Sequence, residues 1–222
     1  MKDKPGKLVH PLQGKQTPPK SDTTRSGKDI NRDKYPAREY SKSDTTATIS
    51  PKGNGHANEV TGLRKLFETQ LRDLYWAEKN FTRTLPKMIQ NTSSGELTDT
   101  LKQHLSITQD HLERCENVFA LMNIPKEGKA SVAMQGLIHE ANDIMNITTP
   151  GSVRDAGIIS AAQKVKHYEI ASYGTLAAFA RQLGEVKAVS LLEETLIEEK
   201  VADAILSEVA EHAVNKAAVN TL

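Results

Sequence analysis

Three glutamates occupy positions where a helix of a globular protein normally carries an apolar side chain. Glu78, Glu169 and Glu199 each interrupt a run of apolar residues spaced three or four positions apart, which is the spacing of one helix face. A buried carboxylate without a partner would cost several kcal/mol, which is comparable with the stability of a small domain. The three carboxylates therefore need partners, and metal ions are the usual ones in the core of a helical bundle.

Two histidines interrupt a fourth apolar run. His104 and His111 lie seven residues apart, which is two turns of a helix. Glu and His side chains that point inward from facing helices form di-iron and di-manganese sites. The pattern leaves an alternative open, because Leu105 and Leu112 could supply the packing and leave both histidines as polar residues at the edge of the face.

Hydrophobic periodicity from residue 58 onward predicts the helices that position these side chains. We expect long helices over residues 59–91, 94–122, 152–184 and 185–216, and a shorter helix over 130–147. Residue types at the predicted ends support these bounds. Ser94 is expected to cap the second long helix, and Ser152 with Asp155 resembles a capping box that has Asp in place of Glu. Gly184 suits the position just after a helix.

The connections between the helices predict how they are arranged. Short turns join the first two and the last two long helices, whereas the middle connection, about 123–151, is long enough to travel the length of a bundle. This connectivity predicts an all-α fold, a ferritin-like antiparallel four-helix bundle with a long crossover that carries the short helix. Residues also match those 91 positions later without a gap, as Glu78 matches Glu169, which indicates a pseudo-repeat of a helical hairpin.

The chain is expected to divide into a tail, 1–57, and a helical bundle, 58–217. Residues 1–58 carry 12 Lys and Arg against 6 Asp and Glu and six of the nine prolines, whereas residues 59–222 are acidic, with 17 against 22. Such a composition predicts a disordered basic tail. A basic tail can hold nucleic acid electrostatically, but here the positive residues are interspersed with Asp, which favours a solvated tail.

Several function classes are disfavoured by what the sequence lacks. The single cysteine, Cys115, rules out an intrachain disulfide and fits a reducing compartment. The first 30 residues show no apolar segment of a secretory signal, and no apolar run approaches the ~20 residues of a membrane span. We therefore expect a cytoplasmic protein with no membrane association. Phosphate-binding loops and hydrolase motifs such as HExxH, G-x-S-x-G and CxxC are also missing.

Four segments resemble the YciE/YciF family of ferritin-like stress proteins. They are LRDLYWAEKNFTRTL, AMQGLIHEANDIM, AAQKVKHYEIASYGTLA and LLEETLIEEKVAD, and HYEIASYGTL within the third is the most specific. The resemblance covers about residues 60–217. It implies a ferritin-like bundle, often a homodimer, with a proposed di-metal carboxylate site and a poorly defined biochemical activity.

The sequence departs from the family pattern at two ligand positions. The resemblance implies Glu at the positions of Ile107 and Lys166, where this chain has an apolar side chain and a cation that would repel a metal. Acidic residues are also expected at Gln135 and His139. By contrast, four positions match the family: Glu78, Glu169, Glu198 and Glu199.

Two hypotheses follow, and the sequence leaves open whether the protein is an enzyme. In the first, the core binds iron or manganese for Fe(II) oxidation or peroxide turnover, with the ligands Glu78, Glu169, Glu198, Glu199, His104 and His111. In the second, Lys166 neutralises the carboxylates, and the protein is a non-enzymatic helical interaction module that has lost its metal. Lys166 can face Glu169 because the two are three residues apart on one helix.

Other polar residues near the predicted site are expected to have structural roles and not to bind a metal. Tyr75, Tyr168 and Tyr173 are expected to be hydrogen-bonded packing residues. Cys115 is expected to be an inert buried thiol, and Asp203 a surface residue.

Overall fold

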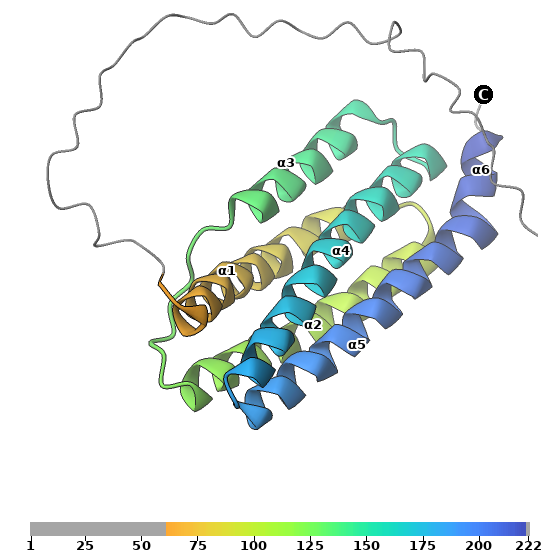
Figure 1. Ribbon diagram of the computed structural model, residues 1–222. Coiled ribbons are helices and arrows are strands. Elements are labelled where there is room, and N and C mark those ends of the chain that lie inside the picture. Colours follow the sequence, from red (N-terminus) through yellow and green to blue (C-terminus); the bar gives the residue numbers. More distant parts are fainter. Residues whose placement is uncertain (1–60, 221–222) are drawn as a thin grey trace, which may run out of the picture. The chain divides into compact units, whose positions relative to one another are not determined.

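The computed structural model describes residues 61–220, and these residues form helices and the segments that connect them, with no strand among them (Figure 1). The all-α prediction is therefore confirmed. The helices are α1 (Leu63–Gln90), α2 (Gly95–Leu121), α3 (Val132–Ile147), α4 (Ser152–Gln182) and α5 (Val186–Val209), and α5 continues through a π-helical turn (Ala210–Val214) into α6 (Asn215–Val219). The predicted tail, 1–57, lies outside the described residues.

The four long helices pack as a bundle built from two hairpins (Figure 1). Helix α1 contacts α2 and α4, and α5 contacts α2 and α4, so that α2 and α4 lie on a diagonal of the bundle. The start of α4 meets the start of α2, because the carboxylate of Asp155 accepts hydrogen bonds from the amides of Ser93 and Ser94, both at 2.8 Å. Neighbouring helices therefore run antiparallel. The long connection carries α3 along α4 and α1, as the sequence predicts.

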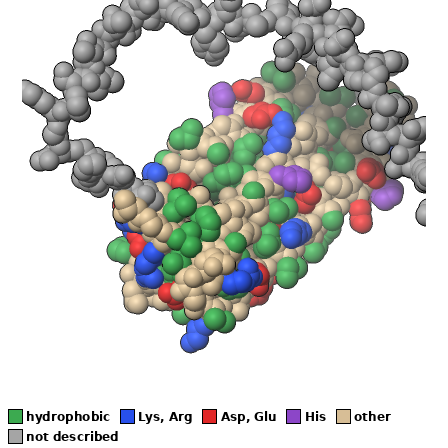
Figure 2. All heavy atoms as spheres, viewed as in Figure 1, with side chains coloured by type: hydrophobic (Ala, Val, Ile, Leu, Met, Phe, Trp, Pro, Cys, Tyr) green, Lys and Arg blue, Asp and Glu red, His purple; other side chains and the backbone are tan. Residues whose placement is uncertain are grey.

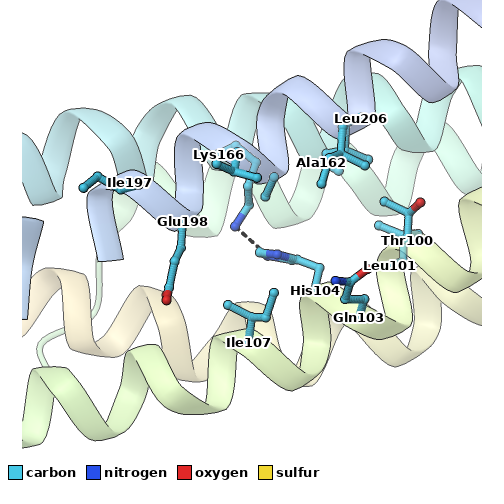
Figure 3. Close-up of a pocket in the computed structure, with 13 residues that line it drawn as sticks. Thr100, Leu101, Gln103, His104, Ile107, Ala162, Lys166, Ile197, Glu198 and Leu206 are labelled. Atoms are coloured by element: carbon cyan, nitrogen blue, oxygen red, sulfur yellow. Dashed lines mark hydrogen bonds between the residues drawn. The ribbon is translucent and has the colours of Figure 1, made fainter. Parts of the chain in front are cut away.

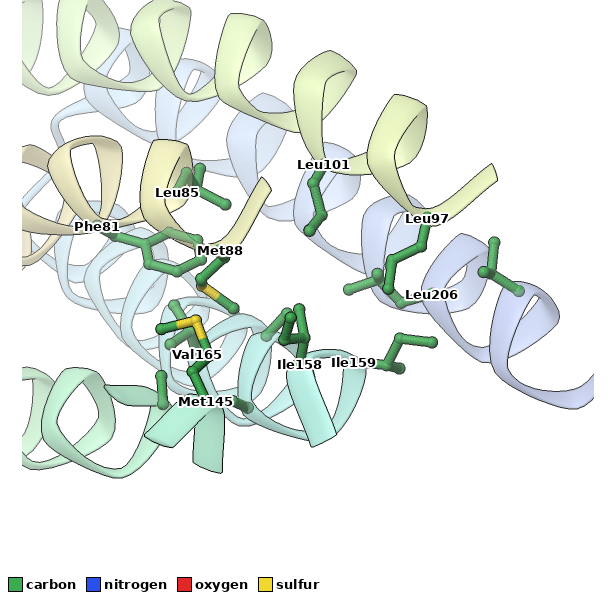
Figure 4. Packing of buried hydrophobic residues seen from close by; sticks show 14 of the residues in the cluster. Phe81, Leu85, Met88, Leu97, Leu101, Met145, Ile158, Ile159, Val165 and Leu206 are labelled. Carbon is green, nitrogen blue, oxygen red and sulfur yellow. The ribbon is translucent and has the colours of Figure 1, made fainter. Parts of the chain in front are cut away.

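Two apolar clusters fill the bundle, one toward each end. The first cluster lies where α1 ends and α4 begins, and includes Phe81, Leu85, Ile158 and Leu206 (Figure 4). The second lies around Phe67 and the other buried residues near the start of α1. On each long helix, the buried polar residues other than Asp155 have members of one cluster before them in the sequence and members of the other cluster after them. The polar side chains are thus held in a layer with apolar packing on both sides.

At the start of α4, the structure contradicts one prediction made from the sequence. Ser94 caps α2 as expected, since its hydroxyl accepts a hydrogen bond from the amide of Leu97. The prediction that Ser152 and Asp155 form a capping box is wrong. The N-cap of α4 is Gly151, with no side-chain cap, and Asp155 instead reaches across the bundle to the turn before α2. A carboxylate near one helix start can satisfy orphan amides of another, and the sequence does not show which.

The end of α4 and the packing of α3 depend on glycines. Gly184 has φ of +77°, and the amides of Gly184 and Glu185 donate to the carbonyls of Arg181 and Ala180, which is the Schellman arrangement. At Gly157, a Cβ atom would lie 2.4 Å from Cγ2 of Ile144. Helix α3 can therefore approach α4 closely only because this residue has no side chain.

The surface of the bundle carries charges of both signs. On the face shown in Figure 2, acidic and basic side chains are scattered among small groups of apolar side chains. Among the described residues, no helix is both long and apolar enough to cross a membrane.

Candidate metal centre

A buried polar layer crosses the middle of the bundle and receives side chains from all four long helices. Each of these side chains is less than a tenth exposed: Glu78 on α1, His104, Thr108 and His111 on α2, Lys166, Glu169 and Tyr173 on α4, and Thr195 and Glu199 on α5. The three glutamates that the sequence places on buried helix faces thus converge between the helices. Both histidines are also buried here, not left at the edge of the helix face.

Two groups of possible metal ligands share one glutamate. We define the Glu78 site as Glu78, His111 and Glu199, and the Glu169 site as His104, Glu169 and Glu199. Within each group, one ligand atom from each residue lies within 4.8 Å of the others. Glu199 therefore stands between the two sites, where a carboxylate could contact both.

The ammonium group of Lys166 lies at the Glu169 site. Its Nζ is 2.5 Å from Oε2 of Glu169 and 2.6 Å from Oε2 of Glu199. It is also 2.6 Å from Nε2 of His104, and 5.1 Å from the centre of the Phe81 ring. The ammonium group thus contacts all three members of the site, with hydrogen bonds to Glu199 and His104 and an ion pair with Glu169. The cation stands where a metal ion would meet the same ligands.

Lys166 stays charged although it is fully buried. Burial alone would lower its pKa, but the neighbouring Glu169, Glu199 and Glu78 raise it above the ordinary value. Burial opposes the ionised form of Glu199 as well, yet Lys166 and a hydrogen bond with His111 hold the pKa of Glu199 at about 2. Lys166 and Glu199 therefore form an ion pair inside the bundle.

The pKa of Glu169 shifts in the opposite direction from that of Glu199. Burial, followed by the nearby charge of Glu199, raises the pKa of Glu169 well above its usual range, and Lys166 offsets only part of this effect. Neither of its oxygens accepts a hydrogen bond of normal geometry within residues 61–220, although Oε2 forms an ion pair with Lys166. One lysine therefore does not satisfy both carboxylates of the Glu169 site.

His104 is neutral, and its tautomer follows from its contacts. Burial first, and then the positive charge of Lys166, lower the pKa of His104 to about 3. Because Lys166 donates to Nε2, the ring proton must lie on Nδ1. The hydroxyl of Thr108 donates to the carbonyl of His104 at 2.9 Å and so holds the turn that carries the ring.

The Glu78 site is arranged around His111. Nδ1 of His111 lies 2.9 Å from Oε1 of Glu199 and 3.9 Å from Oε1 of Glu78, and Nε2 lies 2.9 Å from Oε2 of Glu198. Burial alone would lower its pKa, but the contacts with Glu199 and Glu78 raise it. Each ring nitrogen thus lies beside a carboxylate oxygen, and these contacts favour the protonated form of His111.

Glu78 is held by a tyrosine that the sequence did not assign to the site. The hydroxyl of Tyr173 donates to Oε1 of Glu78 at 2.6 Å, whereas Oε2 has no partner in the described part of the chain. Burial raises the pKa of Glu78, against the lowering effect of His111. Sγ of Cys115 lies 3.4 Å from the Tyr173 hydroxyl, and burial raises the pKa of this thiol, as expected of an inert cysteine.

Glu198 lies beside the two sites and belongs to neither. Its side chain is one-third exposed, and Arg114 binds both of its oxygens, at 2.5 and 2.9 Å. Although burial would raise the pKa of Glu198, Arg114 and then His111 lower it. This pair orients His111 from outside the layer. Arg114 was not found from the sequence, because a contact between helices depends on their relative register.

The remaining residues that the sequence singled out lie outside the polar layer. Ile107 is half-buried and faces a groove beside Lys166. Gln135 and His139 are exposed on α3 and cannot take part in the site, whichever residues stand there. Asp203 lies near the surface, 3.4 Å from His167, as expected. The hydrogen bonds predicted for the tyrosines are present, with Tyr75 donating to Glu116 and Tyr168 paired with Ser131.

The residues of the Glu78 site fit one divalent metal ion. They offer two carboxylates and an imidazole, which suit iron and manganese, and Oε2 of Glu78 is a buried acceptor without a partner among the described residues. A metal there would require His111 to lose a proton. The Glu169 site does not fit a second ion in this arrangement, because the ammonium of Lys166 already contacts each of its members.

Comparisons with known proteins agree on one family. The family model described as a domain of unknown function, DUF892, matches residues 62–219. The protein YciF of Escherichia coli K12 is 46% identical over 159 residues, which cover 71% of this chain and 96% of YciF.

Solved structures give the same result. The crystal structure of the E. coli stress protein YciF matches with a TM-score of 0.68, over 70% of this chain and 99% of that one. YcfI of Rhodopseudomonas palustris, described provisionally as a structural protein, is 39% identical and matches with a TM-score of 0.66, over 68% of this chain and 96% of its own. The chain therefore belongs to the DUF892 family, whose members include relatives of the stress protein YciF.

Proposed function

We propose that the bundle core binds one iron or manganese ion at the Glu78 site and that Lys166 replaces a second ion at the Glu169 site. The observation that carries this proposal is the position of Nζ of Lys166, within 2.6 Å of an atom of each member of the Glu169 site. In a ferritin-like protein with two metal ions, this space would hold a cation of higher charge. The protein would then be a ferritin-like stress protein with a single-metal centre.

The residues around the Glu78 site would have distinct roles. Glu78, His111 and Glu199 would bind the ion, and Tyr173 would orient Glu78 through its hydrogen bond. Lys166 keeps Glu199 ionised, so that the shared carboxylate is ready to ligate. The two apolar clusters exclude bulk water from the layer. A bound iron or manganese ion would supply the redox chemistry for Fe(II) oxidation or peroxide handling.

A second function is favoured by a different observation. Lys166 and His111 place two cations among the carboxylates, so the layer has neutralising charges without a metal. The protein would then be a helical interaction module, and the homodimer implied by the family resemblance would be its functional form. The description of YcfI as a structural protein agrees with this alternative. Either function fits a cytoplasmic protein, since the single cysteine is buried and unpaired.

Elemental analysis separates the two functions. We expect protein purified from cells supplied with iron and manganese to contain about one metal ion per chain. Glu78→Gln should lose most of this metal, because an amide is a weaker ligand. The matched control is Glu113→Gln, which changes an exposed glutamate on α2 and should retain the ion. A chain that holds no metal under these conditions would favour the interaction module.

The role of Lys166 has its own variant. Lys166→Glu removes the internal cation and adds a carboxylate, and Ile107→Glu restores the second ligand that the family resemblance implies. We expect the double variant to bind about two ions per chain. If it still binds one ion, or none, the space around Nζ of Lys166 is not a metal position and this part of the proposal is wrong.

A further inference from the structure

The Glu78 site is enclosed by the bundle. The side chains of Glu78, His111 and Glu199 are all 0% exposed, and an apolar cluster lies on either side of the layer that holds them. A hydrated cation cannot cross such apolar packing without losing its water, which is costly. An ion can therefore reach the site only between two helices, and a side chain must move to admit it.

The apolar groove between α2 and α5 is a poor entrance for a cation (Figure 3). Leu101, Ile107 and Leu206 form part of its walls, and these side chains cannot replace the water of an ion. Lys166 and His104 also line the groove and contact each other there. The ammonium group of Lys166 repels a cation. A cation therefore needs another route to the site.

A continuous chain of polar contacts connects the surface with the Glu78 site through Arg114. Glu194 is 56% exposed, and its Oε1 lies 3.0 Å from Nη2 of Arg114. Arg114 in turn binds both oxygens of Glu198, which is 33% exposed. Oε2 of Glu198 lies 2.9 Å from Nε2 of His111, a member of the site. Side chains that can bind a cation thus follow one another from the solvent inward, with Arg114 between them.

The guanidinium group of Arg114 closes this route. Arg114 is only 16% exposed, and its Nη1 reaches inward to within 3.3 Å of Oγ1 of Thr195, which belongs to the buried polar layer. A guanidinium that binds two carboxylates occupies the oxygens that a divalent cation would use on its way in. The route is therefore blocked by a positive charge that is held at the boundary between the layer and the solvent.

Arg114 can leave this position more readily than a fully buried side chain could. Its carboxylate partners are partly exposed, and ion pairs near the surface contribute little stability, because water replaces the lost contacts. Glu194 and Glu198 would then form an acidic opening, together with exposed Asp110, which precedes Arg114 by one helical turn. An opening lined by charges of one sign attracts ions of the other sign.

We propose that Arg114 is a gate over the Glu78 site: its guanidinium closes an acidic entrance, and Glu194 and Glu198 guide a divalent cation inward when Arg114 swings out. Glu198 would serve a second purpose. Its Oε2 accepts a hydrogen bond from Nε2 of His111 and so leaves Nδ1 of that ring available as a ligand. The inference rests on the proposed function, since a gate needs a metal site behind it.

A gate changes how fast an ion enters and leaves, whereas a ligand changes how tightly the ion is held. Full-length natural protein and Arg114→Met are mixed with Mn(II), and uptake is followed by the loss of the EPR signal of the free ion. Release is followed after addition of excess EDTA, by elemental analysis of the desalted protein. We expect both rates to rise about tenfold in Arg114→Met, because a bidentate ion pair no longer holds the entrance closed. The dissociation constant should change less than either rate.

Arg72→Met is the matched control for the gate. Arg72 lies on α1 outside the polar layer, is 19% exposed, and pairs with Glu127 at 2.7 Å. This variant should leave both rates unchanged. Arg114→Lys keeps a positive charge that cannot bind two oxygens in the same fork, so it should give a smaller acceleration. If Arg114→Met fails to fold, Arg114→Lys decides alone.

Glu194→Gln tests the acidic entrance. We expect it to slow the uptake of Mn(II) at least about twofold at low ionic strength, and we expect the difference to shrink as salt is added, because salt screens exposed charges. Glu208→Gln removes the same charge at an exposed position farther along α5 and should have a smaller effect. Equal effects of the two variants would overturn the guiding role of Glu194.

The outcomes distinguish the gate from the site behind it. If Mn(II) binds but its rates are the same in the natural protein and the Arg114 variants, the gate is overturned and the proposed function stands. Faster release without faster uptake would also overturn the gate, because Arg114 would then only position His111 through Glu198. Natural protein that binds no Mn(II) would contradict both proposals.

Discussion

At the level of single residues, Lys166 decides how the polar layer is stabilised. Lys166→Met would leave ionised Glu199 without its nearest cation in a layer that water does not reach. Breaking a buried ion pair in this way costs about 3–5 kcal/mol. We therefore expect the free energy of unfolding, measured by urea denaturation without added metal, to fall by this amount.

Lys164→Met is the matched control for this prediction. Lys164 lies on the same helix and pairs with Glu140 at the surface, and an exposed ion pair contributes about 0–1 kcal/mol. A small effect of Lys166→Met, equal to that of the control, would contradict the role of Lys166. Glu169 and Glu199 would then need another partner, and a metal would be the leading candidate.

The sequence predicts which residues enter the layer better than it predicts their partners. Glu78, Glu169, Glu199 and both histidines follow from the helical period, because that period fixes the buried face of each helix. The regular spacing of three residues after Glu169 leads to Ser172, but the structure buries its neighbour Tyr173 instead. A straight helix drifts by about 20° per heptad, so adjacent residues can exchange places along a long stripe.

At the level of helices and turns, Asp155 joins the starts of α2 and α4. Asp155→Ala removes the acceptor of the Ser93 and Ser94 amides. Because Ser93 is exposed and water can replace part of this bonding, we expect a loss of about 1–3 kcal/mol in the free energy of unfolding. Asp99→Ala changes an aspartate that is largely exposed near the start of α2. This control should cost less than about 0.5 kcal/mol, and a similar loss in both variants would contradict the proposed junction.

Gly157 provides a second prediction at this level. Gly157→Ala would bring a Cβ atom to 2.4 Å from Cγ2 of Ile144, and this branched side chain has few rotamers with which to move away. We expect α3 to be displaced and the melting temperature to fall, with a cost of about 1–3 kcal/mol.

Gly136→Ala is the control for the packing of α3. This glycine lies inside α3 and is exposed, and a Cβ atom added to it would meet nothing within 4 Å. Alanine should therefore stabilise the helix by about 0.5–1 kcal/mol. Opposite signs for the two glycine variants would support the close approach, whereas stabilisation by both would show that α3 does not pack tightly on α4.

The sequence predicted which segments form helices and how these helices are connected. It did not predict the contacts between helix ends. Ser94 and Gly184 act within a few residues of themselves, so their roles follow from local sequence. Asp155 acts on a turn that lies far earlier in the chain, and the close approach at Gly157 depends on the path of α3. Both are consequences of tertiary packing, which local signals do not encode.

At the level of the whole molecule, the polar layer should make stability depend on pH in two directions. Glu199 has a pKa of about 2, below its ordinary value of 4.5, so its contribution is present above pH 4.5 and is lost as the pH falls. The pKa values of Glu78, Glu169 and His111 are raised. Their contributions are present below the ordinary values of 4.5 and 6.5 and are lost as the pH rises through the folded values. From these four groups, the metal-free protein should therefore be most stable near about pH 4.5 and should lose stability as the pH rises further.

A metal ion should change this profile. Binding at the Glu78 site requires His111 and Glu78 to lose their protons, so the stabilisation by Mn(II) should increase as the pH rises. Urea denaturation at a series of pH values, with and without Mn(II), should give two curves that separate steadily above about pH 6. Glu78→Gln cannot ionise and keeps an acceptor for Tyr173, so its two curves should nearly coincide. If the natural protein instead shows a constant gap at every pH, the ion binds away from the polar layer, at groups that are already ionised. If it shows no gap, Lys166 and His111 are the only cations that the layer uses, and the interaction module becomes the better account of the protein.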